Sequence, residues 1–245
     1  MNTFRSILAI VVAFLMFIIA IPLIAILVII SFGYLQNWVI ENFGKIIGRG
    51  VLATAGIKMD IKQIGEPVDQ PVIYLINHSS TLDMFVIIGL GLPRVRFLAK
   101  YELQFNPIFY LVGNLTGQIF IVRQKSEKAI QKIKKAYKKI KRNRLSILVA
   151  PEGSRKHEGI IGPFKKGAFR MAMDLNYPIV PIYTAGADEL CERDSIITKP
   201  GILTVTIHPP IETSDWSLNT LPDHISEIRS KYLKWAGVTN ENNEY

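Results

Sequence analysis

A short polar segment with a histidine and an aspartate directly follows an apolar run that is typical of a buried strand. The run covers residues 72–76, and the segment NHSSTLD covers 77–83. If Ser80 caps a helix, Asp83 lies in the first turn of that helix, and its carboxylate can reach back to the imidazole of His78. The pair would act as a general base, because a carboxylate stabilises the imidazolium that forms when histidine takes a proton. A capping role alone is the alternative for Asp83.

Two further apolar runs end in residues that suit a phosphate group. The run 118–122 ends at Arg123, and the run 145–149 leads into the segment PEGSR at 151–155. Arginine fits a phosphate monoester because its planar guanidinium donates two parallel hydrogen bonds, although an isolated arginine more often forms a surface ion pair. Sites of α/β enzymes lie at the carboxyl ends of strands. The three strand ends therefore predict one site with a base and a phosphate clamp.

The chain resembles the glycerolipid acyltransferase family, and within it the 1-acyl-sn-glycerol-3-phosphate acyltransferases. The resemblance spans about residues 57–210 and consists of four blocks in the order typical of the family. The matching residues are His78 and Asp83 in the first block, Gly117, Ile119, Phe120 and Arg123 in the second, Pro151, Glu152, Gly153, Ser154 and Arg155 in the third, and Pro181 in the fourth. Val122, Ala150 and Ser154 depart from the commoner residues, and none of these changes removes a residue with an expected role.

The resemblance implies acyl transfer from acyl-CoA or acyl-carrier protein to the free hydroxyl of a lysophosphatidate, which gives phosphatidic acid. His78 would be the base and Asp83 would orient it. Arg123 and Arg155 would hold the phosphate, with Lys100 as a further phosphate or oxyanion contact. The resemblance also implies that Glu152 and Gly153 position the glycerol, in the same turn as Ser154.

The resemblance implies no metal in the site. No bound cofactor is expected either, because acyl-CoA or acyl-carrier protein is a co-substrate. Two alternatives remain open at this point. One is an acyltransferase for another acceptor, such as glycerol-3-phosphate or a different lysophospholipid. The other is a non-catalytic membrane protein that binds lipid through a basic helix.

The elements that must position these residues alternate between strands and helices. Such alternation predicts an α/β fold with a central, mostly parallel or mixed sheet flanked by helices. The expected strands are 72–76, 95–99, 118–122, 145–149, 179–183 and 202–207, and the expected helices are 81–88, 107–112, 127–142, 165–175 and 221–235.

The N-terminal region predicts a membrane anchor. Residues 7–30 are apolar except for Pro22, and no charged residue occurs from Ser6 to Ile40. A helix of this length covers roughly 36 Å, enough for a hydrocarbon core of about 30 Å. Pro22 permits either a spanning helix or a re-entrant hairpin, and a second, amphipathic helix is expected to end near Gly48 or Gly50. A cleaved signal peptide fits poorly, because the apolar run is too long.

The positive charge of the chain is concentrated in one segment. The net charge is +9, yet residues 123–144 hold 11 basic residues and one acid, which leaves 18 basic and 19 acidic residues elsewhere. Within 127–142 the basic residues alternate with an apolar stripe, which predicts a helix that is either merely solvated or attracted to anionic lipid headgroups or an acidic carrier. The chain has no nucleic-acid-binding pattern, so no nucleic-acid partner is expected.

Composition excludes a disordered chain and a disulfide scaffold, since 49% of the residues are hydrophobic and Cys191 is the single cysteine. We therefore expect three parts: membrane-anchoring helices at 1–56, an acyltransferase domain at 57–237 and a frayed tail at 238–245. The active site should face the cytoplasmic side of the membrane, where thioester donors are made.

Overall fold

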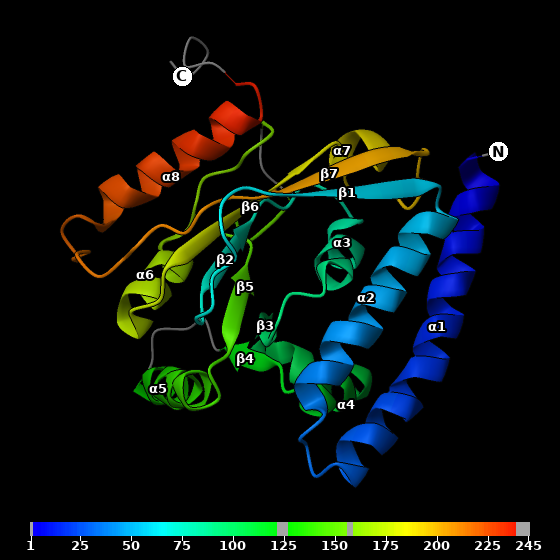
Figure 1. The fold of residues 1–245 in the computed structure, drawn as a ribbon, viewed down its shortest axis with the longest axis horizontal. Coiled ribbons are helices and arrows are strands. Elements are labelled where there is room, and N and C mark those ends of the chain that lie inside the picture. Colours follow the sequence, from blue (N-terminus) through cyan, green and yellow to red (C-terminus); the bar gives the residue numbers. More distant parts are fainter. Residues whose placement is uncertain (1, 122–126, 156–158, 239–245) are drawn as a thin grey trace. The chain divides into compact units, whose positions relative to one another are not determined.

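The computed structural model of the chain describes residues 2–121, 127–155 and 159–238 (Figure 1). The fold is mixed α/β, with seven sheet strands flanked by helices. The chain forms two compact units: unit 1 contains Met1–Gly56 and Met84–Leu148, and unit 2 contains Ile57–Asp83 and Val149–Tyr245. The predicted fold class is confirmed, whereas the predicted three-part domain division stays a prediction.

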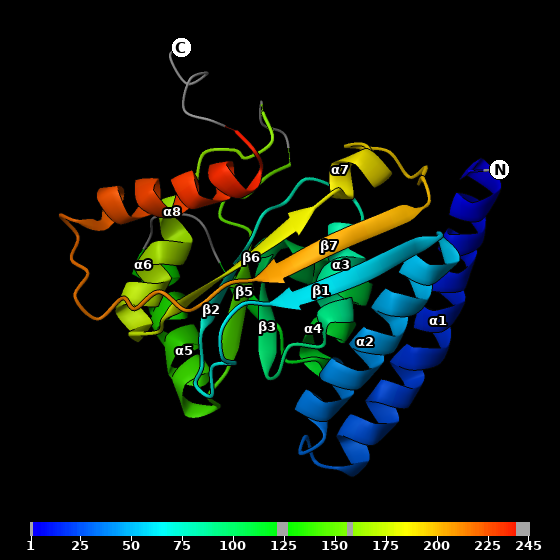
Figure 2. The ribbon, with the colours of Figure 1, turned by 45° about the horizontal axis from the view of Figure 1, so that its top comes forward.

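Four strands of unit 2 lie in the order β1-β7-β6-β2 (Figure 2). They are β1 (Ile57–Gln63), β7 (Gly201–Ile207), β6 (Ile179–Ala185) and β2 (Ile73–Ile76). The pairs β1/β7 and β2/β6 are parallel, and the pair β6/β7 is antiparallel. All four residues of β2 are buried. The strand that leads into the NHSSTLD segment is therefore an interior one.

Helices α6 (Lys166–Leu175), α7 (Ala187–Leu190) and α8 (Leu221–Trp235) complete unit 2. Tyr232 of α8 is fully buried, and its hydroxyl donates a hydrogen bond of 2.6 Å to the carbonyl of Leu75 in β2. Burial raises the pKa of Tyr232 well above its ordinary value. The protonated hydroxyl thus attaches α8 to the strand that carries the candidate base.

In unit 1, parallel strands lie in the order β5-β3-β4. They are β3 (Val95–Lys100), β4 (Ile119–Ile121) and the first three residues of β5 (Ser146–Val149). The helices of this unit are α3 (Asp83–Leu90, from Met84 on), η1 (Tyr101–Phe105), α4 (Pro107–Leu115) and α5 (Glu127–Arg142), in addition to the N-terminal pair.

The N-terminal pair consists of α1 (Asn2–Ile30) and α2 (Gln36–Thr54), joined by a turn at 31–35. Helix α1 continues through Pro22, so the chain reverses at this turn and not at the proline. Helix α2 extends beyond both Gly48 and Gly50, and the predicted end at these glycines is wrong. The helix continues because glycine lowers helix propensity by only about 1 kcal/mol, which packing can offset.

Helix α1 buries small residues and exposes large apolar ones. Ala9, Ala13 and Ala20 are buried, whereas Phe14 and Ile19 are more than half exposed. Among the described residues, α1 alone is long and apolar enough to cross a membrane, judged by length and composition. Small residues allow close helix packing, and exposed large apolar side chains suit contact with lipid.

All the strands and helices predicted from the sequence are present. Helices α5 and α8 have the expected bounds, and the ends of the other elements are shifted. Val122, the last residue of the predicted strand 118–122, lies outside the described residues, as does the predicted tail from 239 on. Three elements were not predicted: β1, η1 and α7. Strand β1 alternates apolar and charged residues, a pattern that is typical of a strand with one exposed face.

Two glycines four residues apart let α2 approach α3 closely. A Cβ added at Gly48 would lie 2.4 Å from the carbonyl oxygen of Phe85 and 2.5 Å from the amide nitrogen of Gly89, and Gly44 meets the Ile88 carbonyl at 3.3 Å. Arg49 closes the contact, because its Nε donates to the Gly89 carbonyl at 3.0 Å. Backbone thus packs against backbone, with no room for a side chain at Gly48.

Replacing Gly48 with alanine should destabilise unit 1 by about 1–3 kcal/mol, because the added methyl group must displace the backbone of α3. The matched control is Gly50→Ala in the same helix, where the new Cβ meets only the flexible end of Met16, at 3.0 Å. That control should be neutral or stabilising by up to about 1 kcal/mol. Thermal unfolding of both variants in detergent measures the difference, and equal midpoints would contradict the close approach.

Candidate active site

The candidate site begins where β2 ends, at a position fixed by the side chain of Asn77. Asn77 is buried, its Oδ1 accepts a hydrogen bond from the Thr184 N–H at 2.8 Å, and its Nδ2 donates to the Thr184 carbonyl at 2.9 Å. Thr184 belongs to β6, the parallel neighbour of β2. The amide of Asn77 therefore extends the strand pairing by one step, and His78 leaves the sheet from a defined point.

His78 and Asp83 form the chemical centre of the site. Nδ1 of His78 lies 2.6 Å from Oδ2 of Asp83, and the same oxygen accepts the backbone N–H groups of Ser79 at 2.8 Å and Ser80 at 3.0 Å. The side chain of Asp83 is 1% exposed and that of His78 is 32% exposed. When Nδ1 carries the proton toward Asp83, Nε2 holds the lone pair that accepts a proton from a substrate.

The turn before α3 directs Asp83 backward. Ser80 Oγ accepts the Leu82 N–H at 3.3 Å, while the Asp83 carboxylate accepts the Ser80 N–H, so that each side chain caps an N–H group of this turn. The predicted reach of Asp83 back to His78 is present. The α-helix itself begins at Asp83 instead of residue 81. Capping and the contact with His78 are therefore not alternatives here, because one carboxylate oxygen does both.

Glu152 lies in unit 2, three residues after the end of β5, and contacts the backbone of the histidine. The buried Glu152 carboxylate accepts the backbone N–H of His78 through Oε1 at 3.1 Å. Glu152 lies in a tight turn that Gly153 closes by donating its N–H to the Ala150 carbonyl at 3.1 Å. Gly153 has φ +68°, a conformation that favours glycine. Ser154 follows it and is half-buried.

Lys165 lies against this turn, and sequence reasoning assigned it no role. A Cβ added at Gly153 would be 3.0 Å from Nζ of Lys165, so the absence of a side chain at Gly153 leaves room for the lysine. The Lys165 N–H also donates to the Pro151 carbonyl at 2.8 Å. The signal for Lys165 in the sequence is the segment GPFKKG at 162–167, in which two adjacent lysines stand between glycines.

Arg155 contacts the segment between His78 and Asp83. Its Nη1 donates to Thr81 Oγ1 at 2.9 Å, and Thr81 in turn donates to the Ser195 carbonyl at 3.0 Å. An ion pair with Asp194 is long, at 4.0 Å, and the Asp194 side chain is 64% exposed. Such an exposed pair contributes little. The remaining N–H groups of Arg155 are therefore suited to an anion held beside Thr81 and His78.

The buried residue Cys191 contacts the turn before α3. Ser80 Oγ donates to the Cys191 carbonyl at 2.8 Å, and the Cys191 thiol donates to the Ser195 carbonyl at 3.3 Å. Burial raises the pKa of the Cys191 thiol. The neutral thiol acts as a packing group and a weak donor, and not as a nucleophile.

The structure brings His78, Asp83, Glu152, Gly153 and Arg155 together in unit 2. Lys100 is the last residue of β3 in unit 1, and Arg123 lies outside the described residues. Asn77, Thr81 and Thr184 also support the site, although the sequence indicated no role for them, whereas Ser80 was expected only as a helix cap. Within the described ranges, no group of three histidine, cysteine or acidic residues could hold a metal ion.

The arrangement can perform proton abstraction next to an anion-binding group. The imidazole is oriented by a buried carboxylate, is reachable from solvent and is fixed at its backbone by a second carboxylate. Among the contacts of the described residues, no serine or cysteine side chain is bonded to the His78 ring. The site therefore shows no nucleophile that this histidine could activate to form a covalent intermediate. The geometry thus favours direct attack by an acceptor hydroxyl.

Comparison with known proteins identifies similar sequences. The model of the acyltransferase family matches residues 58–185 of this chain. A 1-acyl-sn-glycerol-3-phosphate acyltransferase of Limnanthes douglasii is 32% identical over 208 residues, which cover 82% of this chain and 74% of that protein. The corresponding enzyme of Saccharomyces cerevisiae is 30% identical, with 71% of this chain and 59% of the yeast protein covered.

A similar fold occurs in a solved structure. The crystal structure of the 1-acyl-sn-glycerophosphate acyltransferase from Thermotoga maritima has a TM-score of 0.73 and covers 98% of this chain and 99% of its own. The two sequences are 23% identical, so this likeness describes the fold alone. The fold found here, including its N-terminal part, is therefore one that another chain adopts over nearly its full length.

The substitution Asp83→Asn should lower the free energy of unfolding by about 2 kcal/mol, because three N–H groups lose an anionic acceptor inside the protein. Asp174→Asn is the matched control, since Asp174 forms an exposed i,i+4 ion pair with Arg170 at 2.8 Å. Loss of that pair should cost no more than about 0.5 kcal/mol. Denaturant unfolding compares the two variants, and equal losses would contradict the organising role of Asp83.

Proposed function

The chain belongs to the acyltransferase family, and on that premise we propose that it acylates the free hydroxyl of a lysophosphatidate to give phosphatidic acid. The observation that carries the proposal is the His78–Asp83 pair, with 2.6 Å between Nδ1 and Oδ2, at the end of a buried strand. The names of the similar plant and yeast enzymes support the choice of acceptor. The chain is an enzyme of this family; its acceptor and donor are the proposal.

The proposed reaction is a single displacement at the thioester carbonyl. Nε2 of His78 takes the proton of the acceptor hydroxyl while the oxygen attacks the carbonyl carbon, so that a C–O bond forms. The tetrahedral intermediate then collapses, the C–S bond breaks and the thiolate leaves, and the proton held by His78 passes to the sulfur. Asp83 stabilises the transient imidazolium. No acyl group is attached to the protein, and the proposed steps use no metal ion or bound cofactor.

Arg155 is proposed to hold the acceptor phosphate. Its guanidinium is tied to Thr81, three residues after the base, so a phosphate on its remaining N–H groups would lie near His78. Displacement of the long Asp194 contact costs little, because that pair is exposed. Arg123 is proposed as the second phosphate ligand, and Lys100 as a further phosphate or oxyanion contact; both proposals rest on the family's motif.

Glu152 and Gly153 are proposed to position the glycerol part, as the motif implies, together with Ser154. The hydrogen bond from the His78 N–H to Glu152 supports a further role for this carboxylate, which is to hold the backbone of the base. The glycine supports the proposal as well, because an unsubstituted turn lets a substrate approach the backbone.

The enzyme is proposed to work at the cytoplasmic surface of a membrane. Membrane association is supported by α1, whose large apolar side chains are exposed. The acceptor keeps its acyl chain in lipid, and the thioester donor arrives from the aqueous side. The donor is proposed to be acyl-CoA or acyl-carrier protein.

Thioester release by the purified protein tests the proposal. Lysophosphatidate should be consumed faster than glycerol-3-phosphate or a neutral lysolipid, and His78→Ala should reduce turnover by at least about 100-fold, the usual contribution of a general base. The control is His224→Ala, which removes a histidine stacked on Trp216 outside the site. Near-normal turnover by His78→Ala would show that the base is wrongly assigned. Absence of thioester release with every acceptor would favour a lipid-binding protein.

The substitution Arg155→Ala should raise the KM for lysophosphatidate on the order of tenfold or more, because a charge-assisted hydrogen bond to phosphate is lost. The KM for the thioester should change by less than about twofold, because Arg155 is proposed to contact the phosphate of the acceptor and not the thioester. Arg170→Ala, which removes an exposed arginine of α6, is the control. Steady-state kinetics with each substrate varied in turn distinguish the two KM values, and equal increases would contradict the phosphate role.

A further inference from the structure

The outer face of α5 carries positive charge that no acidic residue balances. We call Lys134, Lys135, Lys138, Lys141 and Arg142 the basic face of α5; all five are exposed. No acidic residue occurs between 128 and 144 in the sequence. In the part of the chain that the structure describes, none of these five side chains forms an ion pair.

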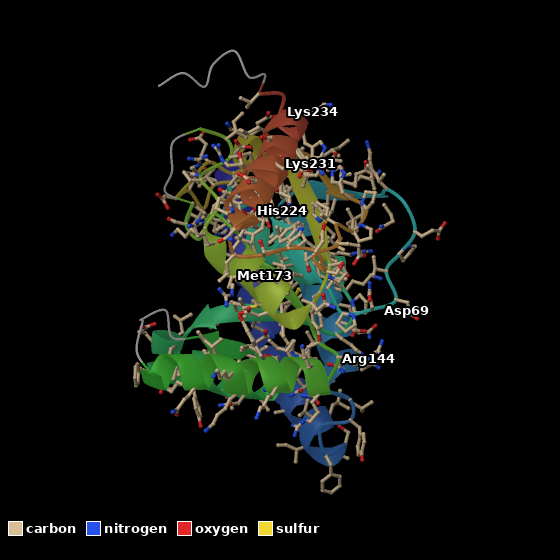
Figure 3. The ribbon with its side chains drawn as sticks, turned by 90° about the vertical axis from the view of Figure 1, so that its left-hand side faces the viewer. Asp69, Arg144, Met173, His224, Lys231 and Lys234 are labelled. Carbon is tan, nitrogen blue, oxygen red and sulfur yellow. The ribbon has the colours of Figure 1, made fainter. Side chains whose placement is uncertain are left out.

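The helix is held by its opposite side. Ile140 is fully buried, and Ile133 and Tyr137 are half-buried. At about 100° per residue, Lys135, Lys138 and Arg142 project about 140–160° away from Ile140. Figure 3 shows α5 in the foreground, with side chains that project from it into open space. The helix therefore packs through its apolar stripe, and the basic face is not needed for that packing.

The basic face is a cost to the helix. Like charges at i,i+3 and i,i+4 repel one another, whereas alternation with glutamate would stabilise the same exposed surface. The pKa of Lys139 is lowered first by burial, then by the charge of Arg96 in β3, and also by its i,i+3 neighbour Arg142. A surface that opposes the stability of its own helix indicates a negatively charged partner.

The position of α5 distinguishes a soluble partner from a membrane. Within unit 1, α5 packs on β4, while α1 packs on α2 and α4. In Figure 1, strands β3 and β4 lie between α5 on one side and the α1–α2 pair on the other, and Figure 2 shows the same for β3. The exposed apolar side chains that a bilayer would contact belong to α1, which lies on the other side of these strands from α5 (Figure 1). A soluble acidic protein can reach the basic face without competing with lipid.

We propose that the basic face of α5 docks an acidic carrier protein that presents the acyl thioester. The proposal rests on the acyl transfer proposed above and names the donor for it. Charge complementarity is the recognition chemistry: a carrier with a row of carboxylates would pair with Lys135, Lys138 and Arg142. Such surfaces speed encounter and fix orientation. They should therefore affect the KM for the carrier-bound donor and not the chemistry at His78.

The test uses the full-length protein with lysophosphatidate and two donors, acyl-carrier protein and acyl-CoA. In the double variant Lys135→Glu, Lys138→Glu, kcat/KM for acyl-carrier protein should fall on the order of tenfold or more at low salt, because two attractions become repulsions. The value for acyl-CoA should stay within about twofold, which also shows that the variant is folded. The neutral variant Lys135→Gln, Lys138→Gln should give a smaller loss in the same direction.

The matched control reverses two exposed lysines of unit 2, Lys58 on β1 and Lys234 on α8, with the same change in net charge. This control should keep the rates with both donors, and added salt should weaken the wild-type preference for the carrier. Equal losses with both donors, or no loss with the carrier, would overturn the proposal. So would loss of binding to anionic vesicles with unchanged donor kinetics, which would assign the face to lipid. Absence of turnover with either donor in the wild type would instead refute the acyl transfer itself.

Discussion

One carboxylate oxygen organises the candidate site. Oδ2 of Asp83 accepts three N–H groups, from His78, Ser79 and Ser80, and the carboxylate is almost fully removed from water. A buried charge is tolerated only when hydrogen bonds replace its hydration. The chain therefore turns sharply before α3, and this turn is what places the imidazole beside the carboxylate. On a continuous helix, residues five apart point in different directions. Orientation of the histidine and initiation of the helix are consequently the same interaction.

The surroundings of this turn are fixed by partners that are distant in the sequence. Asn77 bonds to the backbone of Thr184, 107 residues away, and Ser80 bonds to that of Cys191, 111 residues away. Glu152 holds the His78 N–H from a third segment. Each of these side chains supplies a hydrogen-bond partner that a buried polar group of the turn would otherwise lack. The imidazole is partly exposed, yet the backbone around it is restrained by hydrogen bonds to three sequence-distant segments. A base that must accept a proton at a defined distance benefits from this arrangement.

The sequence predicted what local patterns determine and missed what distant contacts determine. The bounds of α5 and α8 follow from apolar stripes that are complete within each helix. The His78–Asp83 contact follows from capping geometry over six residues. Strand β1 was missed although its residues alternate, because its pairing with β7 lies more than 140 residues ahead in the chain. The partners of Asn77 and Ser80 could not be inferred for the same reason. Helix α2 exceeded its prediction because glycines that weaken an isolated helix are here the contact points with α3.

Separation of charge from chemistry has a physical reason. A histidine that acts as a base becomes positive during the reaction, and nearby uncompensated cations would oppose that step. The window 123–144 holds all of the net positive charge, and the residues around His78 lie outside it in the sequence. Arg155, the cation closest in the hydrogen-bond network, is tied to Thr81 and faces Asp194. In the proposed reaction, a phosphate bound to Arg155 would neutralise this charge as the acceptor arrives, and the proposed base would then take the proton with the acceptor already bound.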